Sequence, residues 1–173
     1  KLVASDAGDD FGSSVAVSNG VIVVGSKGDD DAGSSSGAAY IFVSNGEGGW
    51  SSTKLVADDA AAYDFFGGSV AVSNGTIVVG SSDDDDGSGS AYVFVSDGEG
   101  GWSQVDKLVA SVAAENAFFG NSVAVSNGTI VVGSSGDDDA GSRSGSAYVF
   151  WPAPWTAPPT ATPTTSPTAA PTA

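Results

Sequence analysis

Three residue types are missing from the sequence altogether: it has no cysteine, no histidine and no methionine. The lack of cysteine and histidine excludes disulfide bonds, zinc sites built on thiolates or imidazoles, and catalytic dyads or triads that need either group. Positive charge is nearly as scarce, with 5 basic against 21 acidic residues and a formal net charge of −16. Such a surface repels nucleic-acid phosphates and anionic lipid headgroups, so we expect no nucleic-acid partner.

Long apolar runs are also lacking, and no segment has the length and hydrophobicity of a membrane span, so we expect no membrane insertion. No signal peptide is visible, and the first residue is lysine rather than methionine. We therefore expect either a processed mature protein or part of a longer chain. Proline is confined to one place, because all 7 prolines lie after residue 151.

What the sequence does have is a threefold repeat. "KLVA" begins at Lys1, Lys54 and Lys107, and two Gly-rich "GEGGWS" segments lead to Trp50 and Trp102. "FG" followed by "SVAVSNG" begins at Phe11, Phe66 and Phe119, "IVVGS" at Ile22, Ile77 and Ile130, and "AY" with an apolar pair at Ala39, Ala91 and Ala147. Repeats of about fifty residues with even strand spacing are typical of β-propeller blades.

Each repeat predicts antiparallel strands and almost no helix. "SVAVS" alternates with period two, and the "NG" that follows it is the strongest short signal for a β-hairpin. "TIVVG" is a continuous apolar run, as in a strand buried on both faces. The "AYVF" and "WSQVDKLVA" segments supply a third and a fourth strand. We expect the repeat phenylalanines to pack between blades and the two tryptophans to start the outer strands, with a sugar-binding aromatic platform as the less favoured alternative.

These motifs resemble the FG-GAP repeat of integrin α-type propellers. The resemblance implies an all-β fold of three four-stranded antiparallel blades over residues 1–150, divided at about 1–53, 54–106 and 107–150. It also implies an extracellular or cell-surface location. The sequence departs from the integrin pattern in one respect, because the connection that carries the calcium loop there is only "SNG" here, at Ser18, Ser73 and Ser126. The family's calcium site therefore cannot be carried over to these positions.

Aspartate clusters lie instead between the second and third strands of each repeat. One interpretation is a solvated acidic loop that discourages aggregation. The other is Ca²⁺ binding, because Ca²⁺ takes six to eight oxygen ligands and would relieve the repulsion between adjacent carboxylates. The spacing fits no EF-hand loop, so neither interpretation is excluded. The candidate calcium ligands are Asp29, Asp30, Asp31, Asp83, Asp84, Asp85, Asp86, Asp137, Asp138 and Asp139.

Residues 151–173 form an uncharged tail rich in proline and threonine, which predicts a polyproline II-like stalk carrying O-glycans or, alternatively, a flexible linker. The candidate O-glycosylation sites are Thr156, Thr160, Thr162, Thr164, Thr165, Ser166, Thr168 and Thr172. "NGT" at Asn74 and Asn127 is an N-glycosylation sequon at a predicted hairpin tip.

The order of the strands carries the functional hypothesis. Lys1, Leu2, Val3 and Ala4 match the end of a fourth strand, whereas the last strand, with Tyr148, Val149 and Phe150, is a third strand that no fourth follows. An unpaired edge invites strand addition, so the chain is an excerpt of a longer propeller, or two chains close a six-bladed ring, or chains join head to tail in a filament. We favour a non-enzymatic structural subunit of an extracellular filament or surface assembly, a homo-oligomer or homo-polymer. The alternative is a secreted calcium-binding adhesion or ligand-binding module.

Overall fold

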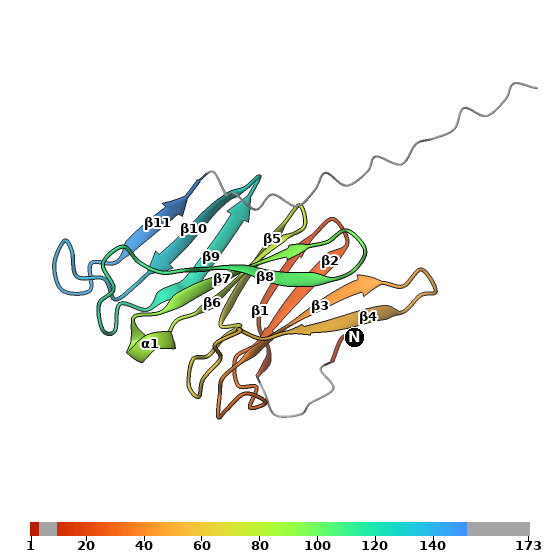
Figure 1. The fold of residues 1–173 in the computed structure, drawn as a ribbon, viewed down its shortest axis with the longest axis horizontal. Helices are drawn as coiled ribbons and strands as arrows, with labels where there is room; N and C mark the ends of the chain where they lie inside the picture. The colour runs from red at the N-terminus through yellow and green to blue at the C-terminus, as the bar shows by residue number, and fades with distance from the viewer. Residues whose placement is uncertain (4–9, 152–173) are drawn as a thin grey trace, which may run out of the picture.

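The chain forms three antiparallel sheets that follow one another along the sequence, as seen in a computed structural model that describes residues 1–3 and 10–151 (Figure 1). The first sheet contains β1 (Phe11–Ser18), β2 (Val21–Ser26), β3 (Ala38–Ser44) and β4 (Trp50–Leu55). The second contains β5 (Ser69–Ser73), β6 (Thr76–Ser81), β7 (Ser90–Ser96) and β8 (Trp102–Leu108). The third contains β9 (Phe119–Ser126), β10 (Thr129–Ser134) and β11 (Ser146–Phe150).

Strand order within each sheet is the sequence order, as a propeller blade requires. The prediction of an all-β fold with four-stranded blades is confirmed for the first two repeats. Among the described residues the third sheet has three strands, so β11 is its edge. The single helix of the described chain is one turn, α1 (Asp84–Gly87), and two of its residues, Asp85 and Asp86, have positive φ angles.

The "NG" dipeptides make the predicted hairpin turns. Asn19 and Gly20 have φ angles of 50° and 79°, and the pairs at 74–75 and 127–128 are closely similar. Both central residues of a type I′ turn need positive φ, which asparagine and glycine tolerate best. The three turns lie side by side, and the Asp-rich loops lie at the opposite end of the strands (Figure 1).

The core lies between the sheets. The face of the first sheet that includes Val23, Ala39 and Ile41 packs against the face of the second that includes Ile77, Tyr92 and Phe94. The other face of the second sheet, with Val78, Ala91 and Val93, packs in the same way against the third. Phe66 and Phe119 are fully buried between sheets, and each ring meets a tyrosine and a phenylalanine of its own sheet edge-on, as expected for the repeat phenylalanines.

Glycines let the backbones of neighbouring sheets approach closely. A Cβ atom on Gly25 would lie 1.9 Å from the carbonyl oxygen of Gly67, and one on Gly80 would lie 1.9 Å from that of Gly120. Ser14 and Ser69 donate hydrogen bonds of 2.8 and 2.7 Å to the same two carbonyls. The glycine of "IVVGS" and the glycine of "FG" thus form one recurring contact between sheets.

Candidate functional site

The Asp-rich loops hold lysines of the outer strands. In the first sheet Lys54 lies opposite Tyr40 on β3, and its Nζ atom is 2.6 Å from Asp29 and 2.6 Å from Asp31. In the second sheet Lys107 lies opposite Tyr92. Its Nζ atom is 2.7 Å from Asp59, 2.9 Å from Asp84 and 3.2 Å from Asp85. Each ammonium also lies about 5.5 Å from the centre of the tyrosine ring, a cation–π distance.

One aspartate of each loop is buried. Asp29, Asp84 and Asp137 occupy equivalent positions, and each accepts a hydrogen bond from the tyrosine hydroxyl of the third strand, at 3.0, 2.7 and 2.7 Å. The buried aspartate of each loop is therefore a structural acceptor. The neighbouring aspartates are exposed, apart from the half-buried Asp83: Asp30, Asp31, Asp85, Asp86, Asp138 and Asp139.

We define the lysine socket of a sheet as three residues: the tyrosine of the third strand, the buried aspartate and one exposed aspartate. The exposed aspartate is two residues after the buried one in the first and third sheets, and directly after it in the second. In the third sheet the lysine socket consists of Tyr148, Asp137 and Asp139, and the backbone N–H of Asp139 donates to Asp137 as that of Asp31 does to Asp29. Among the described residues no lysine or arginine forms an ion pair with Asp137. The third socket has the geometry of the other two without their cation.

Sequence reasoning did not anticipate the lysine sockets. The signal was available, because "KLVA" recurs with the same period as the Asp loops, but the sequence does not show that one lysine and one loop meet across two strands. The solvated-loop interpretation fits the exposed aspartates but not Asp29, Asp84 and Asp137. Of the described residues no group of three or more carboxylates is arranged to hold a metal ion. Calcium binding by these loops stays a prediction.

The sockets shift the titration of their members. Burial alone would lower the pKa of Lys54, but its hydrogen bonds to Asp29 and Asp31 outweigh that effect and raise it. Burial raises the pKa of Tyr40 to about 12, and the hydrogen bond to Asp29 contributes in the same direction. The hydrogen bond to Asp137 raises the pKa of Tyr148 to about 12. For Asp137 itself, the backbone N–H of Asp139 and the Tyr148 hydroxyl lower the pKa.

We expect the protein to lose stability as pH rises between about pH 10 and pH 12. An unfolded tyrosine has a pKa of about 10, so the raised values of Tyr40 and Tyr148 give stability that is complete below pH 10 and is lost as pH rises through 12. Thermal melting from pH 8 to 12 measures this. Tyr148→Phe, which has no hydroxyl to ionise, should lose less stability over that range than the wild type. Equal pH dependence for the two proteins would contradict the role given to Tyr148.

The predicted assembly residues lie at the two ends of the stack. Leu2 packs against the first sheet, next to the cluster formed by Val24, Ala38, Tyr40 and Phe42, and Lys1 and Val3 are exposed. Residues 1–3 form no strand in the single chain, and Ala4 lies outside the described residues. At the other end, Tyr148 and Phe150 pack inward against Phe119, whereas Val149 points outward and is 65% exposed.

The sequon asparagines lie on the exposed hairpin tips. Asn19 donates a hydrogen bond of 3.1 Å to Asn74, and Asn74 donates one of 3.2 Å to Asn127, so the three turns are linked in a row. An attached glycan replaces one of the two Nδ2 hydrogens, which leaves one for this bond. The candidate O-glycosylation sites from Thr156 to Thr172 lie outside the described residues.

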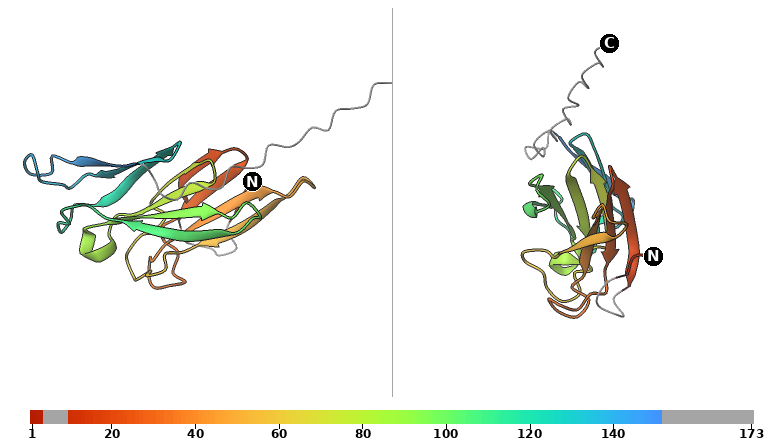
Figure 2. Two further views of the ribbon diagram at one scale, coloured as in Figure 1. Left: turned by 45° about the horizontal axis from the view of Figure 1, so that its top comes forward. Right: turned by 90° about the vertical axis from the view of Figure 1, so that its right-hand side faces the viewer.

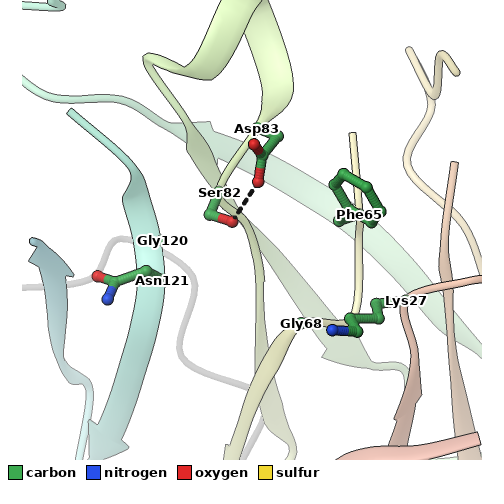
Figure 3. Close-up of a pocket in the computed structure, with 7 residues that line it drawn as sticks. All are labelled: Lys27, Phe65, Gly68, Ser82, Asp83, Gly120 and Asn121. Carbon is green, nitrogen blue, oxygen red and sulfur yellow. Dashed lines mark hydrogen bonds between the residues drawn. The ribbon is translucent and has the colours of Figure 1, made fainter. Parts of the chain in front are cut away.

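A pocket of about 280 Å³ crosses all three repeats (Figure 3). Lys27 enters it from the end of β2, and Asn121 from β9. Ser82 donates a hydrogen bond of 2.8 Å to Asp83, so this carboxylate has a partner of its own. Asp83 is the one predicted site residue in the lining, which contains no pair of titratable groups within hydrogen-bond distance.

A family model for the FG-GAP repeat matches residues 1–42, 50–94 and 102–150. The chain belongs to this repeat family. FG-GAP repeats build β-propeller-type modules that are often extracellular and are typically not enzymes. A comparison with curated proteins finds no match. Among the described residues no helix has the length and apolar character needed to cross a membrane.

Proposed function

We propose that the protein is a structural subunit of an extracellular filament or surface assembly, built by stacking FG-GAP sheets from one chain onto the next. The observation that carries this proposal is that each end of the three-sheet stack exposes apolar side chains whose counterparts inside the stack are covered by a neighbouring sheet. Figure 2 shows the first and third sheets at opposite ends of the stack.

The leading face, defined by Val15 and Val17 on β1, is the first of these surfaces. The two side chains are 69% and 72% exposed. Their counterparts on β5, Val70 and Val72, are buried and half-buried against the first sheet. Among the described residues no sheet covers the exposed pair, whereas the first sheet covers the other pair.

The trailing face, defined by Val131, Ala147 and Val149 of the third sheet, is the second. The equivalent residues of the first sheet, Val23, Ala39 and Ile41, are at most 1% exposed. Those of the second sheet, Val78, Ala91 and Val93, are fully buried. Because leading and trailing faces already pack together twice within the chain, the leading face of a second copy has the shape that the free trailing face requires. Exposed apolar surface of this kind marks an association site.

Such contacts join different patches on the two copies, so they generate either a closed ring or an open filament. The acidic surface suits an extracellular medium, where divalent cations screen it. The tail sites and the two sequons supply glycans in this proposal, and the intact mass of the secreted protein would reveal them.

The alternative function is a calcium-binding adhesion module, and it rests on the Asp-rich loops. Thermal melting with and without Ca²⁺ tests it, because a ligand that binds the folded state raises Tm.

We expect Val149→Asp to convert large assemblies of the full chain into single chains. A carboxylate on the trailing face would lose its hydration on docking without gaining a partner. The matched control is Val112→Asp, because Val112 lies in a connecting loop and is 66% exposed, almost the same as Val149. Light scattering and negative-stain images measure particle mass and shape. Assemblies that survive Val149→Asp, or that Val112→Asp disrupts equally, would contradict the stacking proposal.

A further inference from the structure

We propose that Lys1 of a second copy fills the empty lysine socket of the third sheet, with Leu2 beside it as the missing fourth strand. This inference rests on the proposed function and specifies its partner: another copy of the same chain, bound head to tail. The three sheets offer three equivalent lysine positions, and two of them are occupied within one chain.

The register of the first two sheets fixes where the donated residues would lie. Lys54 pairs with Tyr40 and Leu55 with Ala39, and the same pairing recurs for Lys107 with Tyr92 and Leu108 with Ala91. The third sheet presents Tyr148 and Ala147 at these positions on its open edge. Lys1 and Leu2 are equivalent to Lys54 and Leu55, and among the described residues they pair with no third strand. The FG-GAP family match also begins its three repeats with this strand, at 1, 50 and 102.

Leu2 already makes one of the two sets of contacts that its counterpart Leu55 makes. Leu55 belongs to a cluster that includes its own sheet and the Val79, Tyr92 and Phe94 face of the following sheet. Leu2 packs against the equivalent residues of the first sheet, Val24, Tyr40 and Phe42. Residues 1–3 are therefore placed as the end of a preceding sheet's outer strand would be. A third sheet of another copy, stacked on the leading face, would bring its open edge to them.

The glycine contacts point to the same partner. Gly133 is equivalent to Gly25 and Gly80, but among the described residues a Cβ there would meet only the side chains of its own sheet, Ser122 and Asn121. Gly12 is equivalent to Gly67 and Gly120, and a Cβ there would meet nothing within 4 Å. Stacking the leading face of one copy on the trailing face of another would place Gly12 against Gly133.

Hydrogen bonds complete the correspondence. The backbone N–H groups of Phe66 and Phe119 donate to the carbonyls of Ser36 and Ser88 in the preceding sheet, each at 3.0 Å. Phe11 is equivalent to the two phenylalanines, and Ser144 is equivalent to the two serines. Stacking would place Phe11 of one copy where it can donate the same hydrogen bond to Ser144 of another. The asparagine row would continue in the same way, from Asn127 of one copy to Asn19 of the next.

Charge complementarity makes Lys1 the specific part of this interface. Asp137 is 6% exposed, and Asp139 lies beside it on the surface. In the other two sockets the equivalent carboxylates are within 3.2 Å of an ammonium. Interfacial charge pairs of this type set register and partner choice as well as affinity.

The test uses the full chain and two charge reversals. We expect Lys1→Glu to weaken assembly at least about tenfold, as measured by the concentration at which particles form in light scattering. Lys27→Glu is the matched control, because Lys27 is an exposed lysine outside the proposed interface and the change in net charge is the same. Lys1→Glu combined with Asp139→Lys should recover part of the lost assembly, since the contact at position 139 is restored with its signs exchanged while Asp137 still repels the glutamate.

The outcomes separate this inference from the proposed function. If Lys1→Glu assembles like the wild type whereas Val149→Asp does not, the stacking proposal stands and the lysine inference is wrong. If the wild type remains a single chain at every concentration, both are wrong. If a chelator of divalent cations dissolves wild-type assemblies while Lys1→Glu has no effect, the third socket holds a metal ion and the lysine inference is again overturned.

Discussion

Gly80→Ala is expected to destabilise the folded chain by about 3 kcal/mol, whereas the equivalent change Gly133→Ala is expected to cost less than about 1 kcal/mol. A Cβ on Gly80 would lie 1.9 Å from the carbonyl oxygen of Gly120. Backbone atoms of the third sheet cannot yield without separating it from the second, so the strain cannot be relieved locally. For a chain of this size, 3 kcal/mol lowers Tm by roughly 6–12 °C.

Gly133 differs because its neighbours can move. The nearest atom to a Cβ there is the Ser122 hydroxyl oxygen, at 2.3 Å. The equivalent serines, Ser14 and Ser69, are held by hydrogen bonds to the next sheet. Among the described residues Ser122 has no such acceptor, so its hydroxyl can rotate away.

The two substitutions are compared by thermal melting in the Val149→Asp background, which is expected to keep the chains single. In the wild-type background Gly133→Ala should instead block assembly, because the added methyl group would collide with Gly12 of the next copy. Equal melting temperatures for Gly80→Ala and Gly133→Ala would show that the close approach between sheets is not required. Assembly by Gly133→Ala would contradict the proposed stacking.

Much of this architecture could be predicted from the sequence, because the repeat aligns three independent copies of the same signals. Period-two alternation in "SVAVS" and the "NG" turns predict the strands and hairpins wherever they occur. The strand order is predicted from the position of "KLVA", because this segment ends the strand that follows "AYIF" or "AYVF" in the first two repeats. The open edge at Phe150 was predicted in the same way, and β11 is the edge strand among the described residues.

The role of the aspartates could not be predicted, because it depends on which side chains meet across strands. Four adjacent aspartates, Asp83 to Asp86, look alike in sequence. In the fold Asp84 points inward beneath Tyr92, while Asp85 and Asp86 adopt positive φ angles that turn the loop outward. Burial thus separates neighbouring residues of identical chemistry. The proposed calcium ligands include two acceptors for an ammonium in each of the first two sheets, which composition alone does not reveal.

The three sheets differ in how far their contacts are completed among the described residues. The second sheet buries apolar residues on both faces, and the lysines of the first two sheets complete sockets that other strands have formed. The third sheet packs on one face only, and no lysine or arginine of the described residues pairs with its Asp137.

Lys107→Met should destabilise the second sheet by about 2 kcal/mol, because it leaves the buried carboxylate of Asp84 without its counter-charge. Removing one partner from a fully buried ion pair costs about 3–5 kcal/mol, and the 25% exposure of the Lys107 side chain reduces that figure. Methionine retains the length and apolar character of the lysine stem, so the change removes mainly the charge.

The partners of Lys107 indicate how the loss is tested. Asp84 is 4% exposed, and the Tyr92 hydroxyl lies within hydrogen-bond distance of both Asp84 and Asp59. Without Lys107, the single proton of this hydroxyl would have to serve two carboxylates. In a double-mutant cycle, Asp84→Asn should therefore recover part of the stability lost in Lys107→Met, with a coupling energy of about 1 kcal/mol or more. Denaturant unfolding in the Val149→Asp background measures each free energy of unfolding.

Lys27→Met is the control for loss of a lysine charge, and it should change stability by less than about 0.5 kcal/mol because Lys27 is exposed. Additive effects of Lys107→Met and Asp84→Asn would mean that the socket does not couple its members. In that case a lysine from another copy would gain no binding free energy from the equivalent socket of Asp137 and Tyr148.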